Sequence, residues 1–149
     1  MNKEFEKRRR RLAKLIGKDG IAVIPTASTR VRSRDTDYPY RPDSDFYYFT
    51  GFSEPHAVMI LAPGREDGAF IVCLRAKNPL TEIWDGHMEG LNGVKKNFGV
   101  DQSFKIEDLE TILSSLFLGR QKVFFTLGQD DVLDKTLMRS YNAVRAGQR

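Results

Sequence analysis

The residues with the greatest capacity for chemistry are concentrated between positions 30 and 55. This segment holds four of the five tyrosines of the chain, four aspartates and four arginines. The aspartates form two spaced pairs, Asp35 with Asp37 and Asp43 with Asp45. Carboxylate oxygens at such spacing could bind a divalent cation. Ion pairs with the arginines, or turn caps, explain the same aspartates at least as well.

Two other interpretations use the aromatic residues of this segment. Arginines alternating with tyrosines could hold a single-stranded nucleic acid by stacking, but four carboxylates would repel its phosphates. Tyrosine and arginine also dominate protein interfaces, because they combine wide contact area with a polar tip. We therefore predict interface residues at Tyr38, Tyr40 and Arg41. Composition alone leaves open whether they contact a partner or cover their own domain.

Trp84 is the only tryptophan of the chain and follows Pro79 closely. A single tryptophan belongs more often to a core than to a site. Its neighbours Glu82 and Asp85 are charged, however, which favours partial exposure of the indole. An exposed indole is a suitable wall for an apolar or proline-containing ligand.

The familiar catalytic motifs are missing from the sequence. The two histidines, His56 and His87, are far apart, and Cys73 is the single cysteine, so no closed zinc site is expected. No Gly-x-Ser-x-Gly elbow, Walker loop or Gly-x-Gly-x-x-Gly motif occurs. We predict no catalytic residue, no metal ligand and no cofactor in this chain. Cys73 lies in an apolar run and is expected to be a buried hydrophobic residue.

The charge distribution argues against a nucleic-acid partner. The net charge is +4, yet residues 1–18 hold eight basic and two acidic residues, which leaves 16 basic and 18 acidic residues elsewhere. The excess is one cluster, Lys7–Arg11, which could bind phosphates but is more typical of a solvated helix face. No apolar stretch has the length of a membrane span, and the N-terminus lacks a signal peptide, so a cytoplasmic location is expected.

Hydrophobic periodicity predicts a single α/β domain over residues 1–149, with a mixed sheet flanked by helices. Turn residues between 57–62 and 68–74 predict a hairpin. The polar stretch 26–45 is too long for a loop that merely connects two elements, and it is expected to be functional or interfacial. The predicted helices are 3–16, 107–118 and 131–146, and the predicted strands are 21–24, 46–49, 57–62, 68–74 and 122–127. The helix faces predicted to point inward carry Phe5, Leu12, Leu15, Ile16, Leu133, Leu137, Tyr141 and Val144.

Residues 35–41, 44–52 and 54–55 resemble the signature of the N-terminal domain of aminopeptidase P, the Xaa-Pro aminopeptidase of the creatinase/prolidase superfamily. Segments 6–12 and 82–86 fall where that family has similar segments, so the likeness spans nearly the whole chain. The resemblance implies a second, C-terminal domain of pita-bread fold, absent from this chain. That domain would hold two metal ions, usually manganese, and hydrolyse the bond before proline. The isolated chain is therefore expected to be inactive.

In this family the N-terminal domain supports assembly of a homo-oligomer and helps to wall the active site, including that of a neighbouring subunit. The resemblance thus implies substrate-binding roles for Asp35 and Trp84. The implied partners are the protein's own catalytic domain, neighbouring subunits and a peptide substrate, without nucleic acid or membrane. The alternatives are a prolidase or creatinase relative, a free-standing protein-interaction adaptor, and a nucleic-acid binder that uses Arg8–Arg11. The run 38–52 favours aminopeptidase P over its relatives.

Overall fold

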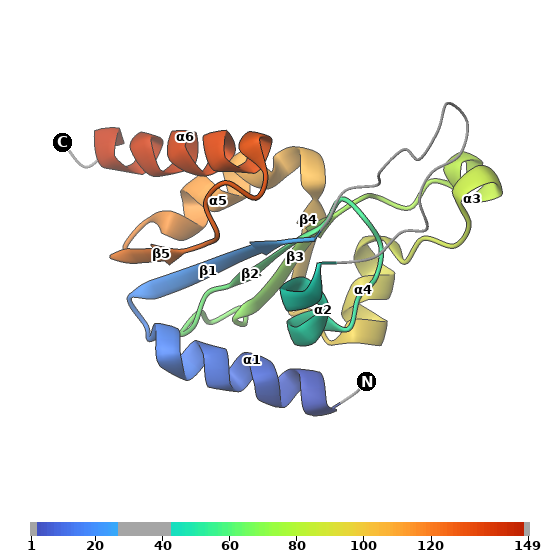
Figure 1. Ribbon diagram of the computed structural model, residues 1–149, viewed down its shortest axis with the longest axis horizontal. Coiled ribbons are helices and arrows are strands. Elements are labelled where there is room, and N and C mark those ends of the chain that lie inside the picture. Colours follow the sequence, from blue (N-terminus) through green and yellow to red (C-terminus); the bar gives the residue numbers. More distant parts are fainter. Residues whose placement is uncertain (1–2, 27–42, 148–149) are drawn as a thin grey trace.

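The computed structural model describes residues 3–26 and 43–147 of the chain, which form a five-stranded sheet with helices on both faces (Figure 1). The predicted α/β class with a mixed, helix-flanked sheet is confirmed. The elements are α1 (Lys3–Ile16), β1 (Gly20–Pro25), α2 (Ser44–Thr50), β2 (Val58–Leu61), β3 (Phe70–Leu74), α3 (Pro79–Asp85), α4 (Gly90–Phe98), β4 (Gln102–Lys105), the 3-10 turn η1 (Ile106–Asp108), α5 (Leu109–Phe117), β5 (Lys122–Phe124) and α6 (Asp131–Gly147).

The sheet has an antiparallel centre and parallel edges, in the order β4-β3-β2-β1-β5. Strands β2 and β3 form the predicted hairpin, in which Met59 is paired with Val72. Strand β1 is antiparallel to β2 and parallel to β5, and β4 is parallel to β3. Parallel neighbours need long crossovers, which here contain the helices. The carboxyl ends of β1, β3, β4 and β5 therefore all lie at one edge of the sheet.

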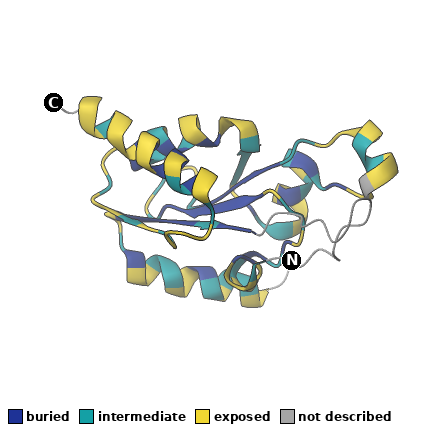
Figure 2. Cartoon of the chain, turned by 45° about the horizontal axis from the view of Figure 1, so that its top comes forward, coloured by how far each residue is buried: buried dark blue, intermediate teal, exposed yellow. Residues whose placement is uncertain are grey.

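Two apolar layers sandwich the sheet, because alternate strand residues point to opposite faces. Ala22 points to the layer built with α1, α2 and α4, whereas its neighbours Ile21 and Val23 point to the layer under α5 and α6. Strands covered on both faces read as continuous apolar runs. Figure 2 shows the buried strands between the two helical layers. Cys73 is fully buried in the second layer, as predicted.

Residues 46–49 form part of the α2 helix, so the predicted strand is wrong there. The Asp43 carboxylate accepts hydrogen bonds from the backbone N–H groups of Asp45 and Phe46, both at 3.0 Å. Gly51 ends the helix with a φ of 70° and donates its N–H to the carbonyl of Tyr47. An N-cap and a left-handed C-cap therefore override the preference of aromatic residues for strands.

The predicted inward faces of the terminal helices need two corrections. Leu15 is 83% exposed and Tyr141 is 42% exposed, so neither belongs to the core. The first helix instead turns Arg9 inward. Its guanidinium lies 3.9 Å from the centroid of the Phe70 ring and donates to the Phe49 carbonyl at 2.8 Å. Burial lowers the pKa of Arg9, an effect that the charges of nearby acidic residues oppose. A long stem with satisfied donors thus allows this arginine to face the core.

Three elements were not predicted: α3, α4 and β4. They are only four to nine residues long, so hydrophobic periodicity gives little signal. Strand β5 is shorter than predicted and ends at Phe124. Within the described ranges, none of the helices combines the length and apolar character needed to cross a membrane.

Candidate functional site

The most exposed apolar side chains of the described chain include three on α3. We call residues 75–90, which leave β3, form α3 and return to α4, the α3 arm. Trp84 is 87% exposed, and Leu80 and Ile83 are both 73% exposed. Their spacing of three and four residues places them close together on the helix surface. The helix lies beyond the end of the sheet, away from both helical layers (Figures 1 and 2). The predicted exposure of Trp84 is confirmed.

The local sequence explains why a helix forms in this arm. The Asn78 side chain accepts from the backbone N–H of Leu80 at 3.0 Å, and Pro79 occupies the first helical position, where its missing N–H costs nothing. Gly86 ends the helix with a φ of 86° and donates its N–H to the Glu82 carbonyl at 3.0 Å. These capping residues fix a short helix that has few packing contacts of its own.

The other predicted site residues divide into two groups. Asp35, Tyr38, Tyr40 and Arg41 lie outside the described residues, so their roles stay predictions. Asp43 is described, and its carboxylate caps α2 and also accepts from the Gln129 side chain at 2.8 Å. The turn-cap interpretation is thus confirmed for Asp43.

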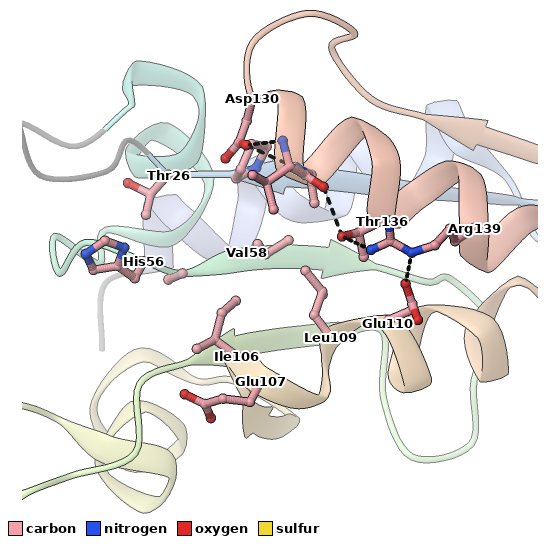
Figure 3. Close-up of a pocket in the computed structure, with 14 residues that line it drawn as sticks. Thr26, His56, Val58, Ile106, Glu107, Leu109, Glu110, Asp130, Thr136 and Arg139 are labelled. Atoms are coloured by element: carbon pink, nitrogen blue, oxygen red, sulfur yellow. Dashed lines mark hydrogen bonds and ion pairs between the residues drawn. The ribbon is translucent and has the colours of Figure 1, made fainter.

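A cavity of about 560 Å³ opens at the sheet edge where β1 ends and β2 begins (Figure 3). The Asp130 carboxylate on its wall accepts from the first N–H groups of α6, at Val132 and Leu133. Arg139 binds the Glu110 carboxylate and the Thr136 hydroxyl. Asp130 is thus engaged in capping α6, and Arg139 and Glu110 form an ion pair that joins α5 and α6.

In the part of the chain that the structure describes, side chains able to bind metals are scattered. Among residues 3–26 and 43–147, no three His, Cys, Asp or Glu side chains lie together in a group that could hold a metal ion. His87 lies 3.5 Å from the Glu89 carboxylate, and His56 is exposed at the cavity. Burial, with a smaller effect of Asp108, raises the pKa of Cys73 to about 12. A buried thiol that stays protonated is a poor nucleophile.

Known proteins are similar to this chain in sequence. The Xaa-Pro aminopeptidase of Escherichia coli K12 is 33% identical over 147 residues, covering 98% of this chain and 33% of the relative. A mitochondrial intermediate cleaving peptidase 55 of Arabidopsis thaliana is 28% identical over 121 residues, covering 81% of this chain and 24% of the relative.

Solved structures of aminopeptidase P proteins also superpose on this chain. Pseudomonas aeruginosa aminopeptidase PepP superposes with a TM-score of 0.93 and 39% identity, over 99% of this chain and 33% of that one. Zinc-substituted E. coli aminopeptidase P in complex with product gives a TM-score of 0.91 and 31% identity, over 99% of this chain and 34% of that one. This chain therefore spans a quarter to a third of the length of these relatives.

The family match is extensive. Residues 5–125 match the family described as "Aminopeptidase P, N-terminal domain". That range includes the signature run, the whole five-stranded sheet and the α3 arm. The chain belongs to the family of aminopeptidase P N-terminal domains and corresponds to this domain of Xaa-Pro aminopeptidase-type proteins.

Proposed function

We propose that this chain is the non-catalytic N-terminal domain of a metal-dependent Xaa-Pro aminopeptidase, which removes an N-terminal residue that precedes proline. The domain contributes to oligomer assembly and to the wall of the active site. A C-terminal pita-bread domain, beyond this chain, supplies two divalent metals, usually manganese, and the hydrolytic chemistry. The observation that carries the proposal is the exposed indole of Trp84 at the end of the α3 arm.

An indole in this position is suited to contact a proline-containing peptide. A tryptophan can bury about 150–250 Å² when it is covered by a partner. At about 25 cal/mol per Å² of apolar surface, its burial offers several kcal/mol before the costs of association. In the proposed role, Trp84 contacts substrate at a neighbouring subunit's pocket, with Leu80 and Ile83 beside it. Asp35 pairs with a basic group near that pocket.

The test is the substitution Trp84→Ala in a full-length parent that carries this domain. We expect kcat/KM on short Xaa-Pro peptides to fall by roughly tenfold or more, as for truncation of an aromatic hot spot. Leu15→Ala is the matched control, because Leu15 is also exposed and apolar but lies on α1, far from the arm in sequence. Unchanged kcat/KM in the Trp84 variant would refute the substrate-contact role.

A companion assay locates the chemistry. The 149-residue chain alone, with manganese and a peptide bearing proline at its second position, is expected to show no turnover. Turnover that a chelator abolishes would mean that this chain carries its own metal site, and would contradict the non-catalytic role. Activity restored only when the remaining part of the parent is present supports the proposal and argues against a free-standing adaptor.

A further inference from the structure

The α3 arm leaves and rejoins the domain through two stems that approach each other closely. Lys77 lies in the outgoing stem and Gly90 at the end of the returning stem. A Cβ atom on Gly90 would lie 2.8 Å from the Cβ of Lys77, and Gly90 has a φ of 71°. Only glycine meets both conditions without strain. The two stems of the arm therefore lie against each other at its base, with no room for a side chain at position 90.

One carboxylate engages both stems at this base. Glu54 comes from the loop between α2 and β2, outside the arm. Its Oε1 accepts from a guanidinium nitrogen of Arg75 at 3.4 Å, in the outgoing stem. Its Oε2 accepts from the backbone N–H of Glu89 at 2.8 Å, in the returning stem. The Glu54 side chain is only 16% exposed, so water competes weakly for these bonds.

A second carboxylate braces the arm from within. Glu82 of α3 accepts from the backbone N–H of Met88 at 2.8 Å and lies 3.8 Å from the Lys77 ammonium. Met88 itself is buried and anchors the returning stem in the domain. Both carboxylates accept hydrogen bonds from the backbone of the returning stem, and the apolar side chains of α3 remain exposed.

We propose that Glu54 is a positioning residue that sets the direction in which Trp84 is presented, by tying the two stems of the arm together. Glu54 touches no reacting atom in this role and acts only through Trp84. Holding a contact residue in its bound geometry removes the ordering cost of binding. The consequence for catalysis depends on the proposed function, whereas the clamp itself can be measured in this chain alone.

The first experiment measures the backbone order of the arm by NMR relaxation in the 149-residue chain. In the unmodified chain we expect order parameters in α3 of about 0.85, and in Glu54→Ala below about 0.6. Glu54→Gln should fall between them, because the amide keeps an acceptor for the Glu89 N–H but loses the charge that faces Arg75. The indole N–H of Trp84 gives an independent signal, since it is the only tryptophan.

Asp101→Ala is the matched control for general destabilisation. Asp101 also lies in a loop and its carboxylate accepts from a backbone N–H, that of Phe70 at 2.9 Å, which lies outside the arm. This variant should lower the melting temperature while α3 keeps its order. Unchanged α3 order in Glu54→Ala, or equal loosening in Asp101→Ala, would overturn the clamp.

The second experiment asks whether the clamp acts through Trp84 in a full-length parent. If part of the arm population points away from the pocket, apparent affinity falls in proportion. We expect Glu54→Ala to lower kcat/KM roughly three- to tenfold, chiefly through KM. The same substitution should have no further effect when Trp84 is already alanine, because residues that act as a unit are not additive.

The outcomes of this second experiment separate the two proposals. Additive losses in the double variant would overturn the positioning role of Glu54. A loosened arm with unchanged kinetics in both single variants would instead refute the contact role of Trp84 and leave the clamp intact.

Discussion

At the scale of single residues, the run from Asp43 to Glu54 forms α2 and the loop that carries Glu54. The Thr50 hydroxyl donates to the Phe46 carbonyl at 2.8 Å and accepts from the Phe52 N–H at 3.0 Å, which turns the chain after α2. Phe46 and Phe52 are almost fully buried. The polar members of this run therefore shape the loop that brings Glu54 to the base of the α3 arm.

The buried Cys73 thiol is expected to make the folded domain less stable at alkaline pH. Burial raises its pKa from 9.0 to about 12, so between these values the unfolded chain releases a proton that the folded chain keeps. The contribution of the thiol to the free energy of unfolding is thus fully present below the unfolded pKa. It falls as pH rises above that value, by up to about 1.4 kcal/mol per pH unit. We expect urea unfolding to show this loss as pH rises from about 8 to about 10. Cys73→Ala should show a shallower fall, and equal slopes would contradict the assignment.

At the scale of elements, α1 packs against the end of α2 so closely that the contact leaves no room for a side chain at Gly51. Gly51, the C-cap of α2, has a φ of 70°, and a Cβ there would lie 2.6 Å from a ring carbon of Phe5. Phe5 also packs edge-on against Tyr47, with centroids 5.8 Å apart. The close contact of the two helices therefore depends on this glycine.

Gly51→Ala tests that joint. The left-handed backbone alone costs an L-residue about 1–2 kcal/mol, and the contact with Phe5 adds to it. We expect a loss of about 2–4 kcal/mol in the free energy of unfolding, measured by urea denaturation. Gly119→Ala is the control, because Gly119 has a φ of 81° and a Cβ added to it would meet no atom within 4 Å. Equal losses would show that the Phe5 contact costs nothing.

Elements with strong local signals were predictable, and those held by distant contacts were not. The spacing of apolar residues predicts α1 and α6, and turn residues predict the β2–β3 hairpin. The α2 helix was missed because its cap at Asp43 outweighs the strand preference of its aromatic residues. The exposure of Trp84 was predictable because its neighbours are charged. The position of Glu54 was not, because its bond to Glu89 joins residues 35 positions apart, which no periodicity encodes.

At the scale of the whole molecule, β5 leaves the sheet with an open edge. It is three residues long, and within residues 3–26 and 43–147 its one strand partner is β1. Hollows of about 520 and 290 Å³ lie beside it, lined largely by apolar residues. Exposed apolar side chains occur in β5 and in the segments next to it, namely Leu118, Phe124, Leu127, Met138 and Tyr141. Unpaired strand edges with apolar surroundings tend to associate.

We therefore expect the isolated chain to self-associate through this edge. Sedimentation velocity should show a dimer whose population grows with protein concentration. Phe124→Lys should shift the chain to monomer, because a charge on an edge strand opposes edge pairing. Trp84→Ala, which removes another large exposed aromatic residue, should leave the dimer unchanged. A dimer lost in the Trp84 variant and retained in the Phe124 variant would place the contact on the α3 arm instead.

The parallel pairing of β1 with β5 also governs how the chain reaches this structure. Residues 20–22 pair with residues 122–124, so the interior strand β1 lacks one of its two neighbours until residue 124 has been synthesised. The β2–β3 hairpin can form long before, from residues close in sequence. Folds that depend on such distant pairings form slowly, since the entropy of closing a long loop must be overcome first. On the ribosome, β1 to β4 could therefore pair with one another first, and the edge of β1 that pairs with β5 would stay open until the strand after α5 emerges.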